Sequence, residues 1–144
     1  MAILPIITAP DRRLETKSKS LERVDDATRT LMDDMVETMR AAPGIGLSAV
    51  QVGSPIRAIV VGVRETDREE DAPEILFLVN PEITTESEDL VLIEEGCLSL
   101  PDQFEDVERP DTITVKFLDY DGKPQTLQYG GTTARVIQHE MDHL

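Results

Sequence analysis

The sequence feature that most constrains this chain is the run His139-Glu140-Met141-Asp142-His143 at its end. Histidines four residues apart project from one face of an α-helix and can together bind one metal ion. Glu140 lies about 100° around such a helix from His139, so its carboxylate can act on a water at the metal without binding the metal. These are the only two histidines in the chain. The alternative is an accidental match on an amphipathic helix, and the motif favours a metal-binding helix.

Cys97, the only cysteine, is the natural third ligand. Open hydrolytic metal sites usually have three protein ligands and a water, so two imidazoles leave one ligand missing. Gly96 directly precedes Cys97, and glycine gives the backbone room to turn and approach a metal closely. A lone cysteine judged without this context is more often a buried apolar filler. A single cysteine also excludes an internal disulfide and fits a reducing compartment.

The remaining pattern indicates a helix, then strands, then a second helix. Apolar residues at helical spacing predict the first helix from Val24 to Ala42, which Pro43 and Gly44 end. We expect the methionines of this helix to lie in the core. The second helix follows Gly130 and Gly131, with Thr132 as its cap, and continues to Leu144.

Short segments rich in β-branched residues predict the strands. A hairpin turn at Asp121-Gly122 joins two of them, which indicates antiparallel pairing. Residues 64–74 are expected to form an acidic surface loop. Together these elements predict one α+β domain over residues 1–144, with antiparallel sheets packed around a C-terminal metal-binding helix. The predicted strands are residues 58–63, 75–79, 90–93, 112–117 and 126–129.

Charge and hydropathy exclude several classes of function. The chain has 14 Lys and Arg against 29 Asp and Glu, a formal net charge of −15. This field repels phosphate backbones, so we expect no direct nucleic-acid binding. No apolar run approaches the roughly 18 residues that span a bilayer, and the apolar stretch at residues 3–7 lacks the features of a signal peptide. We therefore expect a soluble, cytoplasmic protein without membrane association.

Three segments resemble the signature motifs of the peptide deformylase family, in the family's order and at similar separations. Ser48 stands where the family more often has alanine. The chain ends one residue after the second histidine. Familiar bacterial members continue into a longer C-terminal helix, whereas shortened members are known among phage-encoded deformylases. The three segments are Gly44-Ile45-Gly46-Leu47-Ser48-Ala49-Val50-Gln51, Glu95-Gly96-Cys97-Leu98-Ser99 and Gln138-His139-Glu140-Met141-Asp142-His143-Leu144.

The resemblance implies a metal-dependent hydrolase that removes the formyl group from N-formylmethionine at the start of nascent polypeptides and releases formate. It implies that Glu140 carries the proton, and that the Gln51 side chain and the Leu98 backbone amide stabilise charge on the formyl oxygen. It also implies a set of substrate-binding residues and a set of metal ligands. The substrate-binding residues are Gly46, Ile45, Val136, Arg109 and Gly96, and the metal ligands are Cys97, His139 and His143.

The expected cofactor is one divalent metal ion, with Fe(II) first, zinc second, and nickel or cobalt as substitutes. The expected partners are N-formylmethionyl peptides and nascent chains, in the host's bacterial cytoplasm for a phage-encoded protein. The ribosome docking that C-terminal tails provide in some members is not expected here, because the sequence lacks that extension.

Two other classes of function remain open. A zinc peptidase could use the same histidine motif with cysteine as third ligand, and it would differ by cleaving internal peptide bonds. A structural metal-binding or interaction domain could use its negative surface for a basic partner. A fully closed four-ligand site would favour this second class.

Overall fold

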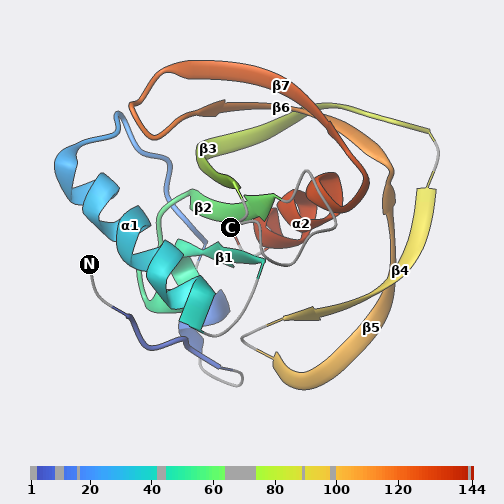
Figure 1. Cartoon of the computed structure of the whole chain (residues 1–144), viewed down its shortest axis with the longest axis horizontal. Coiled ribbons are helices and arrows are strands. Elements are labelled where there is room, and N and C mark those ends of the chain that lie inside the picture. Colours follow the sequence, from blue (N-terminus) through green and yellow to red (C-terminus); the bar gives the residue numbers. More distant parts are fainter. Residues whose placement is uncertain are drawn as a thin grey trace.

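The computed structural model describes residues 3–8, 12–15, 17–41, 45–63, 74–88, 90–97, 100–142 and 144. In the described part of the chain, α1 comes before the strands and α2 follows the last of them, as labelled in Figure 1. The elements are η1 (Arg12–Glu15), α1 (Asp26–Ala41), β1 (Gly46–Ser48), η2 (Ala49–Val52), β2 (Ala58–Val63), β3 (Glu74–Glu86), β4 (Leu90–Cys97), β5 (Leu100–Pro110), β6 (Thr112–Leu118), β7 (Pro124–Gly130) and α2 (Gly131–Met141).

The strands form two antiparallel sheets. Five strands pair in the order β1-β2-β3-β6-β7, so that β1 is an edge strand, and β4 pairs with β5 in a separate ribbon. In Figure 1 the strands curve around α2, which lies inside their bend, while α1 lies outside it. The predicted α+β class, with antiparallel sheets around the last helix, is confirmed.

Strand β2 lies between the two helices and is buried on both faces. Ala58 and Val60 belong to the apolar cluster that contains the buried side of α1. Ile59 and Val61 alternate with them and belong to the cluster that contains the apolar side of α2. Since side chains along a strand point alternately to opposite faces, one apolar run packs against both helices. Neighbouring β1 therefore also has one face toward each helix.

Helix α1 buries its methionines, as predicted. Met32, Met35 and Met39 are all fully or almost fully buried against the sheet. Asp25 lies just before the helix, and its carboxylate accepts hydrogen bonds from the backbone N–H of Thr28 at 2.9 Å and from its hydroxyl at 2.8 Å. The bond from the Thr28 backbone, followed by that from its hydroxyl, lowers the pKa of Asp25. This cap explains why the helix begins after Val24.

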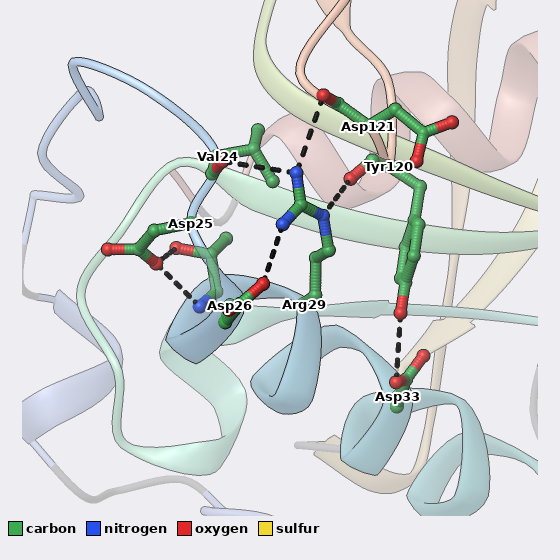
Figure 2. A network of polar contacts seen from close by, with 8 residues as sticks. Val24, Asp25, Asp26, Arg29, Asp33, Tyr120 and Asp121 are labelled. Carbon is green, nitrogen blue, oxygen red and sulfur yellow. Dashed lines mark hydrogen bonds and ion pairs between the residues drawn. The ribbon is translucent and has the colours of Figure 1, made fainter.

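Helix α1 is also attached to the turn between β6 and β7 by polar contacts (Figure 2). Arg29 Nε donates to the carbonyl of Tyr120 at 3.0 Å, and its Nη1 pairs with Asp26 at 2.9 Å. The hydroxyl of Tyr120 donates to Asp33 at 3.0 Å, and this hydrogen bond raises the pKa of Tyr120. The network fixes the angle of α1 on the sheet and lies apart from α2.

Several sequence expectations need correction. Helix α2 begins at Gly131 with Gly130 in the cap position, so Thr132 lies within the first turn, and the helix ends at Met141. Strands β1 and β5 were not predicted. The predicted helix stop at residues 42–44 lies outside the described residues, as do residues 64–73 of the acidic loop. The loop was predicted to extend to residue 74, but Glu74 begins β3. Within the described ranges, no helix is long and apolar enough to cross a membrane.

Candidate active site

The candidate site forms where β1 contacts the last turns of α2. Leu47, in the middle of β1, points into the cluster with α1, so Gly46 and Ser48 both face α2. Their neighbour across this contact is Glu140, only 5% of whose surface is exposed. The acid of the histidine motif is thus buried against the first of the three sequence segments.

Glu140 is held by contacts with β1 at both its backbone and its carboxylate. The hydroxyl of Ser48 lies 2.7 Å from the Glu140 carbonyl oxygen and 2.9 Å from its Oε2, so its single proton is shared between these two acceptors. A Cβ atom added at Gly46 would lie 2.9 Å from Glu140 Cγ and 2.7 Å from Val136 Cγ1, closer than real Cβ contacts. Only glycine at position 46 lets β1 approach α2 this closely.

Gln51 belongs to η2, which follows β1 directly, and only 1% of its surface is exposed. Its Oε1 accepts a hydrogen bond from the backbone N–H of Ser48 at 2.9 Å. That bond fixes the amide plane and leaves Nε2 as the donor end of the side chain. Ser48 therefore contacts both predicted catalytic side chains, Gln51 through its backbone and Glu140 through its hydroxyl.

The predicted metal ligands are only partly described. His139 precedes Glu140 on α2, and its Nε2 atom is buried. A neutral imidazole nitrogen is a common metal ligand. Cys97 ends β4 opposite Leu100, but only its backbone is described, and His143 lies outside the described residues. Among the described side chains no group of three potential ligands gathers. The ligand set as a whole therefore stays a prediction.

Polar contacts tie α2 to β5, the partner of the strand that ends in Cys97. On the α2 side, the contacting side chains are spaced three and four residues apart, so they lie on one side of the helix. They fix the helix that carries His139 against the ribbon that carries Cys97. The contacts are Arg135 Nη1 to the Val107 carbonyl at 2.9 Å, Gln138 Nε2 to the Pro110 carbonyl at 3.0 Å, and the ion pair of Arg109 Nη2 with Asp142 Oδ2 at 2.8 Å.

The predicted substrate-binding residues lie around β1, α2 and the β4–β5 ribbon. Ile45 directly precedes β1 and is 59% exposed, while Val136 is buried beneath Gly46. Gly96 pairs with Phe104 in the ribbon. Arg109 contacts Asp142, and its predicted contact with a peptide stays a prediction. Leu98, the predicted backbone donor, lies outside the described residues.

Ser48 was not predicted as a functional residue, although it stands where the family more often has alanine. The structure shows this hydroxyl on the buried carboxylate of Glu140. The sequence did contain an indication of this role, because a polar side chain stands in place of alanine within an otherwise apolar, glycine-containing segment. A buried hydroxyl needs a partner, and the partner here is the motif's acid.

A helix that carries a His-Glu pair with the glutamate buried, packed against a glycine-containing edge strand with a buried glutamine beside it, is typical of a metal-dependent hydrolase. The model of the polypeptide deformylase family matches residues 3–144. The chain belongs to this family.

Relatives agree in sequence and in structure. A peptide deformylase of Pelagibacter ubique is 49% identical over 144 residues, covering all of this chain and 82% of the relative. The crystal structure of the Ehrlichia chaffeensis peptide deformylase in complex with actinonin has a TM-score of 0.93 and 43% identity, covering 100% of this chain and 84% of that one. A Met-Ala-Ser-bound peptide deformylase of Acinetobacter baumannii has a TM-score of 0.88 and 37% identity, covering 99% and 92%.

Proposed function

We propose that this hydrolase removes the formyl group from N-formylmethionyl peptides, including nascent chains, and releases formate. The observation that carries the proposal is the buried carboxylate of Glu140, which follows His139 on α2 and is held against Gly46 and Ser48. The family match and the Acinetobacter baumannii relative with Met-Ala-Ser bound support this substrate class, because Met-Ala-Ser is the peptide that remains after deformylation of formyl-Met-Ala-Ser.

Cys97, His139 and His143 would hold the metal ion of this site. One thiolate with two imidazoles suits Fe(II), which we place first, and also zinc, nickel or cobalt. The buried Nε2 of His139 fits this role. When bound, the metal supplies Lewis-acid activation of a water molecule near neutral pH.

Glu140 acts as the proton carrier. Its carboxylate takes a proton from the attacking water and delivers it to the amine that leaves when the formyl C–N bond breaks. Burial beneath β1 keeps bulk water away from the carboxylate, and the hydroxyl of Ser48 fixes its Oε2. The chemistry uses one carboxylate for both transfers, so no second acid is needed.

Gln51 and Leu98 stabilise the negative charge that grows on the formyl oxygen. The bond from the Ser48 N–H to Gln51 Oε1 orients the amide so that Nε2 is the donor. The backbone N–H of Leu98, next to Cys97 in sequence, is the second donor. A preorganised donor of this kind lowers the activation free energy by about 3 kcal/mol.

The substrate peptide lies along β1. As the edge strand of the five-stranded sheet, β1 can pair with an added peptide strand through the backbone of Gly46. Ile45 and Val136 lie near the methionine side chain, and Gly96 and Arg109 belong to the peptide-facing side. Pairing through the backbone favours an extended peptide with little dependence on its later side chains.

Formate release from formyl-Met-Ala-Ser by anaerobically prepared protein tests the proposal, with metal content measured alongside. Acetyl-Met-Ala-Ser is the matched control substrate, because it keeps the peptide and enlarges only the blocking group. We expect formate and Met-Ala-Ser from the first peptide and no internal cleavage of either. Internal cleavage would indicate a peptidase, and an inert metal-loaded protein would contradict the enzyme function.

A further inference from the structure

We infer that Ser48 is a positioning residue for the carboxylate of Glu140, a role that rests on the proposed function of Glu140. The two residues are 92 positions apart in sequence and meet only through the packing of β1 on α2. Ser48 is fully buried, and its hydroxyl lies within hydrogen-bond distance of two Glu140 atoms, the backbone carbonyl oxygen and Oε2.

The Ser48 hydroxyl contacts Glu140 at its backbone and at its carboxylate. Glu140 lies one residue before the end of α2, where its carbonyl oxygen also accepts a hydrogen bond from a backbone N–H of the helix cap. The Ser48 hydroxyl lies 2.7 Å from the same carbonyl oxygen, which adds a contact between β1 and the backbone of α2. Its contact with Oε2 at 2.9 Å then selects one orientation of the carboxylate.

Gly46 completes this arrangement from the same face of β1. The position of a Cβ at Gly46 would be 3.2 Å from Glu140 Oε1, so this oxygen lies on the Gly46 side while Oε2 lies on the Ser48 side. The alternation of small residues along β1 thus gives each carboxylate oxygen its own neighbour. Alanine at position 48 would keep the packing and lose the hydroxyl that contacts Oε2.

The first test compares Ser48→Ala with the unchanged protein at equal metal content. A lost hydrogen bond to a charged group predicts a fall in kcat of about tenfold, with KM within roughly twofold. Thr38→Val is the matched control, because it removes another buried hydroxyl, which donates to the Asp34 carbonyl on α1. We expect the control to lower the melting temperature and to leave kcat unchanged.

A second test separates the carboxylate contact from the backbone contact. In a Glu140→Asp background the carboxylate is one methylene shorter, so it withdraws from Ser48 while the backbone carbonyl stays in place. We expect Ser48→Ala to reduce kcat there by much less than about tenfold. An equal reduction in both backgrounds would overturn the inference, since the hydroxyl would then act through the backbone alone.

The outcomes also distinguish this inference from the proposed function. Unchanged kcat in Ser48→Ala, together with loss of activity in Glu140→Gln, would overturn the role of Ser48 and leave Glu140 as the proton carrier. Full activity in Glu140→Gln would remove the proposed role of Glu140, and the role of Ser48 with it. A fall in kcat that follows only a loss of metal would likewise contradict positioning.

Discussion

Replacing Gly46 with alanine tests how closely β1 must approach the catalytic helix. The added Cβ would lie 2.7 Å from Val136 Cγ1, 2.9 Å from Glu140 Cγ and 3.2 Å from Glu140 Oε1. Carbon atoms do not approach within 3.0 Å without a shift, so either β1 or both α2 side chains must move. Since β1 is paired along its whole length with β2, we expect the α2 side chains to move.

Two magnitudes follow from this geometry. Overpacking a buried contact costs roughly 1–3 kcal/mol, which for a chain of this size lowers the melting temperature by several degrees. Displacing a catalytic group by about 1 Å lowers the rate on the order of 10²-fold. Gly46→Ala should therefore lose far more kcat than stability, as measured by formate release and thermal unfolding of the metal-loaded protein.

Two further variants make the test specific. Gly130→Ala adds a Cβ 3.7 Å from Thr112 Oγ1, an ordinary contact, and should leave kcat near the unchanged value. Adding Val136→Ala to Gly46→Ala removes the 2.7 Å clash and leaves the 2.9 Å contact with Glu140. The melting temperature should recover while kcat stays low. Full kcat in Gly46→Ala, or recovery of both quantities together, would refute the reasoning.

Three other predictions concern the helix contacts, pH and the metal. Gln138→Leu removes the buried donor to the Pro110 carbonyl and should cost about 1–3 kcal/mol in the free energy of unfolding by chemical denaturation; an unchanged midpoint would contradict this. The raised pKa of Tyr120 means that its bond to Asp33 stabilises the fold below pH 10.0 and is lost as pH rises through the higher folded value. Asp33→Asn should lower that pKa in an ultraviolet titration, and no change would argue against the contact. Verified metal removal should lower the melting temperature and speed amide exchange at residues 135–144, whereas unchanged values would exclude metal support of α2.

Sequence patterns predicted the helices and strands whose buried faces require apolar residues at regular spacing. Residues 58–63 read as a strand because both faces of β2 are buried, and the methionines of α1 read as core for the same reason. Strand β5 was missed because residues 100–110 carry many acids and two prolines in a two-stranded ribbon. Strand β1 has three residues, and the small size of Gly46 and Ser48 follows from contact with Glu140 and not from strand propensity.

In the candidate site, too, some features could be predicted from the sequence and others could not. Helical spacing alone places His139 beside Glu140, because both lie within one turn. The contact of Ser48 with Glu140 depends on how β1 packs on α2, which spacing within one segment does not contain. The hydrogen bond that orients Gln51 likewise depends on the turn from β1 into η2. Roles that depend on how separate elements pack together could be identified only from the structure.

Formate release by Glu140→Gln tests the central claim most directly, since this change keeps the size of the side chain and removes its capacity to carry the proton. The variant and the unchanged protein are compared anaerobically on formyl-Met-Ala-Ser at equal metal content. We predict a loss in kcat of at least about 10²-fold, with the metal still bound. Activity equal to that of the unchanged protein would contradict the assignment of Glu140 as the proton carrier of this site.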